Sequence, residues 1–534
     1  MNPRPSRIAA NLFLIFFSSV HFFPVSGNSR IENQDLIVDQ IVINNQNIFD
    51  LNTPSEQLWY TKIINRLHYR TRESTIRREL FLREGRSYHP EILDETERYL
   101  RRRPYLADAR ISADTPVDHH TNVTVWTRDS WSTDPGFNFS SAGGQSKYRF
   151  HLDEKNLFGT GTHISTEFSK DADRNTLQFE YDNRNLFGRH DELTMGYGHA
   201  TDGINKRFKY AHPFYAIWEK REYGVNVFQR SREQSLLTGG SVSGRYKEDV
   251  QTYDAYYGRR LSGNMNSAFR LTGGYRFGDR HRKAVSNLSP ALVPPSQRLS
   301  GLFIEGEWDR QHFIKRTNLD AFNRVEDINL APVVSLETFG NLFAGENQRG
   351  VEIKGNFDKG FAFGERHLVK NNLNFFAKYD HNGLTNSTLS TNTYWYYSWR
   401  SAHTFVMHIQ SDLGLHLDGS NPITLGGENG LRGYPAHNFS GNWKLLFNIE
   451  DRIFTPVTFF HTIRLGGVFF YNAGDAGTGH LGPLKQSVGL GLRLGILRSA
   501  TTSVIRMDMA TALQPKYVPS GKRLEFSVST GQAF

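Results

Sequence analysis

The sequence of 534 residues contains no cysteine. Disulfide bonds and metal sites built on thiolates are therefore excluded, because both need the sulfur of that side chain. Acylation at a lipoprotein cysteine is excluded for the same reason. An exported chain with this composition must be stabilised by burial or by closure of a barrel, which removes unpaired strand edges.

Long hydrophobic runs are also scarce. The mean hydropathy is −0.53, and no run comparable to Ile8–Val25 follows it, so a bundle of membrane helices is excluded. Arg4 and Arg7 precede this run and Val25-Ser26-Gly27 follows it, which is typical of a secretory signal peptide over residues 1–27. A transmembrane anchor is the alternative, although the run is short for a spanning helix and is interrupted by polar residues.

Catalytic motifs are missing as well. The sequence has no GxSxG, HExxH or Walker A pattern in a supporting context, so we expect no enzyme and no cofactor. His119-His120 could bind a metal, but a histidine pair in an exposed turn is more often inert, and we expect no metal. The net charge is +9, and the excess lies in residues 136–534. Nucleic acid is not an expected partner of an exported chain, and a cationic lumen or loops facing anionic lipid explain the charge.

Aromatic residues are abundant, with 39 Phe and 23 Tyr. A polar average with many aromatics suits a transmembrane β-barrel, in which lipid-facing and lumen-facing residues alternate and cancel. The same composition also suits a soluble β-sandwich or propeller, so composition does not decide between them.

Residues 28–135 have a mixed pattern. A strand is expected at Leu36–Ile43 and helices at Thr75–Phe81 and after His89-Pro90, the second ending at Arg101–Pro104. Two short strands follow, near Tyr105–Ser112 and Asn122–Trp126. The predicted order is β-α-α-β-β, with no prediction for the insertion at residues 46–70.

From about residue 136 the period changes to two, which is typical of strands. Polar residues, many of them charged, occupy one face of these strands and apolar and aromatic residues the other, which favours a membrane barrel over a soluble sheet. Residues 136–534 are expected to form an antiparallel transmembrane barrel, with 16 strands if each strand and its connection take roughly 25 residues. The strands that carry the alternation are centred on Leu177–Tyr181, Leu373–Tyr379, Val488–Leu494 and Ile505–Met509.

Four features resemble the BamA/TamA-type outer-membrane assembly factors, also described as bacterial surface antigens. Residues 75–130 are similar to a POTRA module, and the NLFG motifs at Asn156–Gly159 and Asn185–Gly188 resemble those at the start of the family's barrel. Gly426–Pro435 (GGENGLRGYP) resembles the family's sixth extracellular loop. The last strand, with Phe526, Val528 and the terminal Phe534, resembles its C-terminal assembly signal. The resemblance implies a mostly β fold with an α+β POTRA domain ahead of the barrel.

The loop motif is the candidate functional site. Residues 418–441 are rich in Gly and Asn and read as a long, solvated loop, whereas the resemblance implies that the loop folds back into the lumen. An unpaired buried guanidinium is costly, so Arg432 would then need an acidic partner. Strand parity places Glu450 on the lumen face, and Asn472 stands where the family pattern has Asp, which leaves Glu450 as the main anionic partner. The full set of site residues is Leu431, Arg432, Gly433 and Tyr434 in the loop, and Glu450, Phe470, Asn472 and Gly474 on the strands.

The resemblance implies a protein of the Gram-negative outer membrane, with its POTRA domain in the periplasm. Its function would be to help insert and fold other β-barrel proteins, by adding client strands to a barrel seam or to the POTRA edge strand. The implied partners are the lipid bilayer with lipopolysaccharide, unfolded barrel clients, and periplasmic or lipoprotein partners. Two rivals stay open: a two-partner secretion transporter, and a passive pore or enzyme accessory. Only about eight residues separate the expected cleavage site from the first strand, which leaves no room for the second POTRA module and plug helix typical of the transporters.

Overall fold

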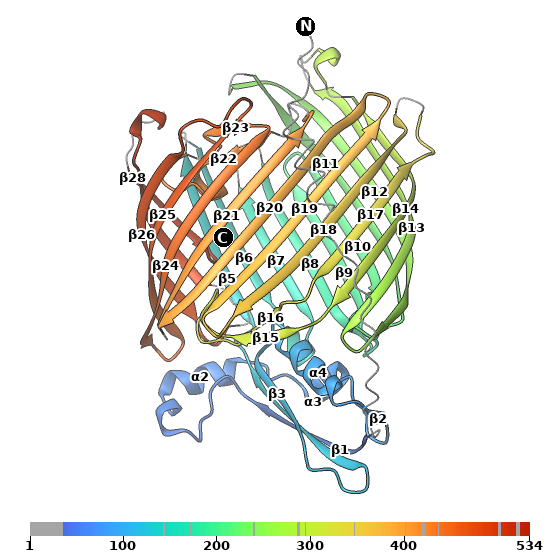
Figure 1. Ribbon diagram of the computed structural model, residues 1–534, viewed down its shortest axis with the longest axis vertical. Helices are drawn as coiled ribbons and strands as arrows, with labels where there is room; N and C mark the ends of the chain where they lie inside the picture. The colour runs from blue at the N-terminus through green and yellow to red at the C-terminus, as the bar shows by residue number, and fades with distance from the viewer. Residues whose placement is uncertain are drawn as a thin grey trace.

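The computed structural model describes residues 36–534, except 143–144, 171–173, 239–240, 286–288, 294, 346–347, 401, 418–421, 436, 500–503 and 519–523. The expected signal peptide at residues 1–27 lies outside the described residues. Two parts are visible, a small N-terminal α+β domain and a large β-barrel that stands on it (Figure 1). We call the barrel end beside this domain the near rim and the opposite end the far rim.

The N-terminal domain contains a four-stranded sheet in the order β2-β1-β4-β3. The central strands β1 and β4 are parallel, and the other pairs are antiparallel. Helices α3 and α4 pack on this sheet, and Ile76 and Leu100 from them are fully buried with Val38 and Val123. The expected β-α-α-β-β elements are all present, and two elements are added: the helix α2 in the insertion and the two-residue strand β2. The elements are β1 (Leu36–Gln46), α2 (Trp59–Leu67), α3 (Glu73–Glu79), β2 (Ser87–Tyr88), α4 (Glu91–Arg101), β3 (Leu106–Ala113) and β4 (His120–Asp129).

In the described residues the barrel is a closed, antiparallel sheet of 20 strands, in which β28 returns to β5. Its strands are β5 (Thr133–Ala142), β6 (Gln145–Glu154), β7 (His163–Lys170), β8 (Asn175–Leu186), β9 (Asp191–Ala200), β10 (Gly203–His212), β11 (Arg221–Thr238), β12 (Ser241–Asn264), β13 (Ser267–Val285), β14 (Gln297–Arg310), β17 (Val333–Asn341), β18 (Gly350–Phe363), β19 (His367–Asp380), β20 (Gly383–Arg400), β21 (His403–Leu415), β24 (Trp443–Phe459), β25 (Ile463–Gly477), β26 (Lys485–Ile496), β27 (Val504–Ala512) and β28 (Leu524–Thr530). Two small hairpins lie outside this sheet, β15 (Phe313–Arg316) with β16 (Glu326–Asn329), and β22 (Ile423–Leu425) with β23 (Phe439–Gly441). Short 3-10 turns are η1 (Pro54–Glu56), η2 (Leu157–Gly159), η3 (Pro290–Leu292), η5 (Gly427–Asn429) and η6 (Pro515–Tyr517).

The expectation of 16 strands was wrong. It assumed roughly 25 residues for each strand with its connection. Several hairpins instead turn in two or three residues, as between Ala200 and Gly203, Asn264 and Ser267, and Asp380 and Gly383. Because two-residue turns are the shortest common connections of antiparallel strands, the same length of chain supplies more strands than expected.

Alternation along the strands separates two faces. On β24, the side chains from Lys444 to Arg452 with even numbers are buried inside the barrel, and their odd-numbered neighbours point outward. Outward-facing apolar side chains stay widely exposed, such as Phe469 at 62 % and Phe526 at 69 %. Such a belt would be unfavourable in water and is typical of a surface that faces lipid.

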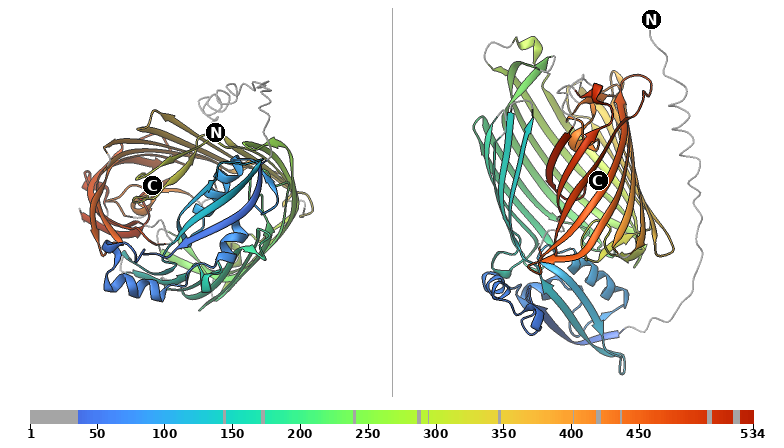
Figure 2. Two further views of the ribbon diagram at one scale, coloured as in Figure 1. Left: turned by 90° about the horizontal axis from the view of Figure 1, so that it is seen from below. Right: turned by 90° about the vertical axis from the view of Figure 1, so that its left-hand side faces the viewer.

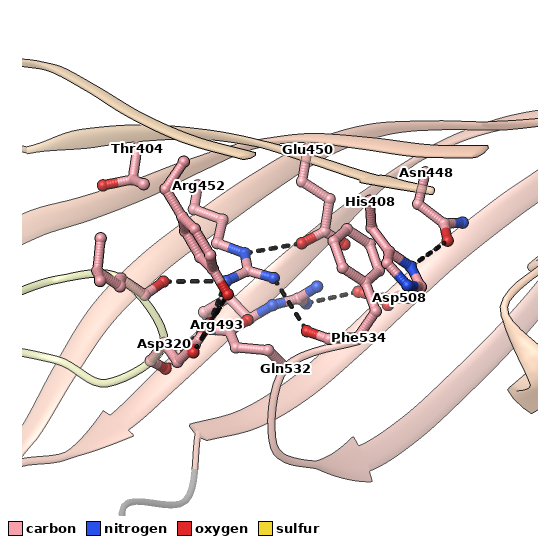
Figure 3. Close-up of polar contacts among 12 residues, drawn as sticks. Asp320, Thr404, His408, Asn448, Glu450, Arg452, Arg493, Asp508, Gln532 and Phe534 are labelled. Atoms are coloured by element: carbon pink, nitrogen blue, oxygen red, sulfur yellow. Dashed lines mark hydrogen bonds and ion pairs between the residues drawn. The ribbon is translucent and has the colours of Figure 1, made fainter. Parts of the chain in front are cut away.

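The lumen is filled from the near rim by the connection between β14 and β17. Leu319 of this segment is buried among Leu368, Tyr396 and Val406 of the barrel wall. Its Asp320 carboxylate lies 2.7 Å from Arg452 Nη1 (Figure 3). The connection, residues 311–332, therefore folds into the lumen at this end of the barrel.

The N-terminal domain is docked across the near rim (Figure 2). Arg101 of α4 forms a two-pronged ion pair with Asp327, with N–O distances of 2.7 and 2.8 Å. Both NLFG motifs form tight turns on this rim and hold α3. The Gly159 carbonyl accepts hydrogen bonds from the Arg72 amide and the Thr75 hydroxyl, and Asn185 Nδ2 donates to the Arg78 carbonyl.

An aromatic cluster completes the docking contact and gives it a pH dependence. His190, in the turn before β9, is hydrogen-bonded to the Tyr99 hydroxyl at 2.9 Å and stacks on Tyr215. Burial, with the nearby Arg103 guanidinium and His212, lowers the pKa of His190 from 6.5 to about 4. The released histidine thus binds a proton more readily than the docked one, so docking weakens as the pH falls from about 6.5 to about 4.

We expect protease cleavage between the two parts to accelerate over this pH window in the intact protein and not in His190→Gln. Cleavage that is independent of pH in the unaltered chain would contradict the role given to His190.

Candidate functional site

The loop between β21 and β24 folds into the barrel instead of extending into solvent. Its hairpin of β22 and β23 leads residues 431–434 against the inner wall. Leu431 and Tyr434 are fully buried and pack with Leu425, Leu446 and Ala512. The Tyr434 hydroxyl donates to the Gln486 carbonyl at 3.1 Å and to Gln514 Oε1 at 2.9 Å. Apolar burial at both ends of the motif therefore fixes the arginine between them.

The Arg432 guanidinium is held by three side chains of the wall. Its Nη1 donates to Glu450 Oε1 at 2.8 Å and to Asp508 Oδ2 at 3.1 Å, and its Nη2 donates to Asn472 Oδ1 at 2.9 Å. The guanidinium also lies over the Phe470 ring, 3.5 Å from its centroid. The charge is thereby neutralised, and one flat face is covered by an aromatic ring, which is the geometry of a cation–π contact.

Further charged side chains extend this network from Glu450 and from Asp508. Glu450, which is fully buried, also accepts a hydrogen bond at 2.9 Å from Arg452 Nε. Asp508 binds Arg493 through its second oxygen. Figure 3 shows Arg452 between Glu450, Asp320 and the terminal Phe534, so the network joins the lumen loop to the connection from the near rim.

Two glycines allow the close approach of loop and wall. Gly433 has φ +84°, and a Cβ there would lie 3.2 Å from the Ala512 amide nitrogen of β27. A Cβ on Gly474 would lie 2.9 Å from the Leu445 carbonyl oxygen and 3.2 Å from the Leu425 side chain. Larger residues would therefore push the motif away from its partners, because the contacts on both sides involve backbone or buried groups.

The structure brings together all eight loop and lumen residues that the sequence singled out. Sequence reasoning did not identify Asp508, Arg493 and Arg452 as members of the site, although strand parity puts Arg452 on the same lumen face as Glu450. Asp508 and Arg493 stand on the polar faces of alternating strands, which places them in the lumen. The alternation does not predict which strands contact the loop. Asp475, which follows the departure at Asn472, is engaged elsewhere and binds Lys485.

The C-terminal residues divide into two groups. Phe526 and Val528 point outward from β28 and are 69 % and 45 % exposed. The expectation that Phe534 ends this strand was wrong, because β28 ends at Thr530 and Gly531 takes φ +83°. The tail then turns into the lumen, where the Phe534 ring stacks on His408 at 5.0 Å.

This division predicts different effects of two substitutions. Phe526→Ser removes an apolar group from the outward face, so we expect it to lower the yield of folded barrel in lipid vesicles. Phe534→Ser changes a lumenal contact and should leave that yield nearly unchanged. Heat-modifiable migration on gels measures both yields, and an equal loss for the two variants would contradict the assignment of Phe534 to the lumen.

A metal site has little support. Among the described residues, Asp134, His151 and Asp153 could place ligand atoms together, but Asp134 is paired with Lys155 at 3.1 Å. Of the histidine pair, His120 contacts Asp39. No helix in the described part of the chain is long and apolar enough to cross a membrane.

The class of protein follows from these parts: a closed β-barrel with an inward-folded loop, preceded by a small α+β domain. Residues 62–126 match the POTRA family, described as a surface antigen variable number repeat. The chain therefore combines a POTRA module with a closed β-barrel that follows it.

Comparison with known proteins adds distant similarities only. No curated protein matches the chain. Among solved structures, BamA from Haemophilus ducreyi lacking POTRA domains 1–3 is 12 % identical, with TM-score 0.35, and the match covers 92 % of this chain and 84 % of that one. CdiB from Acinetobacter baumannii is 11 % identical, with TM-score 0.44 and coverages of 92 % and 74 %. CdiB from Escherichia coli is 11 % identical, with TM-score 0.40 and coverages of 98 % for both chains.

Proposed function

We propose that this protein is an assembly factor of the bacterial outer membrane, which helps other β-barrel proteins to insert and fold, with its POTRA domain in the periplasm. The observation that carries the proposal is the seam of the barrel. β28 has 7 residues and is the shortest barrel strand in the described part of the chain, whereas β12 on the opposite side has 24. A short last strand leaves few hydrogen bonds to exchange when a client strand adds to the edge.

The filled lumen supports the same proposal against a passive pore. Loop residues 431–434 pack against the inner wall, and the connection at residues 311–332 and the terminal Phe534 occupy the lumen toward the near rim. A passive pore would need a wide water-filled path, and these segments occupy part of the space in which it would lie. In the proposed mechanism the barrel acts from its seam, and no covalent chemistry takes place.

Client strands would first meet the POTRA sheet. Its edge strand β3 pairs only with β4 in the described sheet, and Glu97 and Arg101 of α4 bind the Ile111 amide and the Ala109 carbonyl on its other side. An extended segment would therefore add to this edge by β-augmentation only after displacing these two side chains. In this proposal, lipid and lipopolysaccharide surround the barrel. Periplasmic or lipoprotein partners would hand clients on to it.

Depletion of the protein, followed by quantitative proteomics of the outer membrane, tests the function in cells. Assembly predicts a selective loss of many β-barrel proteins. Loss of one secreted protein would indicate a two-partner secretion transporter instead. An unchanged outer-membrane proteome, together with large and steady conductance of the purified protein in planar bilayers, would indicate a passive pore.

A further inference from the structure

The helix α2 lies in the insertion that precedes the POTRA helices α3 and α4. Its apolar face points outward, and its polar face is buried. Trp59, Ile63 and Leu67 follow one another at four-residue spacing and are 74 %, 47 % and 67 % exposed. The polar Thr61 on the opposite face is fully buried. An ordinary surface helix turns its apolar stripe toward the core, so this stripe needs another apolar partner.

Polar bonds to the backbone, rather than an apolar core, fix this orientation. The Thr61 hydroxyl donates to the Glu56 carbonyl at 2.6 Å. Asn65 exchanges two hydrogen bonds with the backbone of Phe49, at 2.8 and 3.1 Å. The outward direction of the apolar stripe is therefore built into the insertion and is held by specific contacts.

The insertion is also tied to the near rim of the barrel. Arg498, in the turn after β26, forms an ion pair with Glu56 at 2.5 Å and lies over the Phe49 ring. The Tyr60 ring of α2 makes an edge contact with Phe460, in the turn after β24, at 5.8 Å. Figure 1 shows α2 below the barrel wall, at the side of the POTRA domain.

The apolar stripe continues the outward belt of the barrel. Val457, Phe459 and Phe460, at the near rim, are 47 %, 48 % and 66 % exposed. Lys62 and Arg66 are exposed beside the stripe, and α2 contains no acidic residue. Tryptophan and aliphatic residues flanked by basic ones are the composition of helices that lie in the headgroup region of a bilayer, where the basic ends reach lipid phosphates.

We propose that α2 binds the phospholipid headgroup region of the leaflet that surrounds the near rim of the barrel. Trp59, Ile63 and Leu67 enter this leaflet, and Lys62 and Arg66 contact its phosphates. The helix thereby fixes the POTRA domain against the membrane as well as against the barrel. This inference relies on the barrel spanning a membrane, but it does not depend on the assembly activity.

The absence of cysteine allows a direct test on the full chain. Leu67→Cys is labelled with an environment-sensitive fluorophore, and the protein is reconstituted into vesicles of phosphatidylethanolamine and phosphatidylglycerol that contain lipid spin-labelled near the glycerol. Val117→Cys is the matched control, because Val117 is 70 % exposed in the turn between β3 and β4, and that hairpin extends away from the barrel (Figure 1).

We expect the spin-labelled lipid to quench the emission of the label at Leu67. The emission of the label at Val117 should be unchanged. Lys62→Gln with Arg66→Gln should reduce the quenching at Leu67 in vesicles with phosphatidylglycerol, but not in vesicles of phosphatidylcholine alone. Equal emission at the two positions, in protein whose heat-modifiable migration shows a folded barrel, would overturn the proposal. Emission that changes only when an unfolded client is added would assign α2 to client binding and would overturn it as well.

Discussion

Replacing Glu450 with glutamine is expected to cost about 3–5 kcal/mol of barrel stability, the range for removing one partner of a buried ion pair. Glu450 is fully buried and is shared by Arg432 and Arg452. Loss of its charge leaves two buried guanidinium groups with one acidic partner each, Asp508 and Asp320. The free energy of unfolding in urea, followed through heat-modifiable migration, measures the effect.

Glu167→Gln is the matched control, because Glu167 pairs with Arg149 on the barrel wall at 3.3 Å and both side chains are partly exposed. Its loss should cost no more than about 1 kcal/mol. Combining Glu450→Gln with Arg432→Gln should cost less than the sum of the two single changes, since each single change leaves the other partner uncompensated. Additive costs, or an effect of Glu450→Gln no larger than that of the control, would show that the two side chains are not coupled.

Replacing Tyr434 with alanine is expected to release the loop from the wall. Tyr434 is fully buried, and truncation of a buried aromatic side chain costs about 3–5 kcal/mol. The loop carries Arg432 with it, so the lumen should open and the conductance in planar bilayers should rise.

Tyr434→Phe separates packing from hydrogen bonding. It keeps the ring and loses only the hydroxyl contacts to Gln486 and Gln514, for about 1 kcal/mol. Its conductance should stay close to that of the unaltered protein. If the alanine and phenylalanine variants conduct equally, the loop is not what closes this part of the lumen.

Short-range sequence patterns were sufficient to predict the faces of the strands and the helices of the POTRA domain. The period of two gave the faces of the strands, and it placed Glu450 in the lumen before any neighbour was known. The helices of the POTRA domain followed from apolar spacing, with Ile76 and Leu100 as their buried residues. These properties depend on residues that are close together in the sequence.

Properties set by distant contacts could not be predicted in this way. Asp508 lies 76 residues from Arg432, and the register of the successive strand pairs from β24 to β27 places it beside the loop. The inward turn of Phe534 depends on space left beside His408 and Arg452. The apolar stripe of α2 is visible in the sequence, but periodicity gives a face and not what that face contacts.

Reconstitution of the full chain in lipid vesicles tests the proposed function most directly. A urea-unfolded β-barrel client is diluted into vesicles with and without the protein, and its folding is followed by heat-modifiable migration. Assembly activity predicts faster appearance of the folded client in the vesicles that carry the protein, and a smaller acceleration with Tyr434→Ala. Equal folding rates with and without the protein, whose own barrel is folded, would contradict an assembly function.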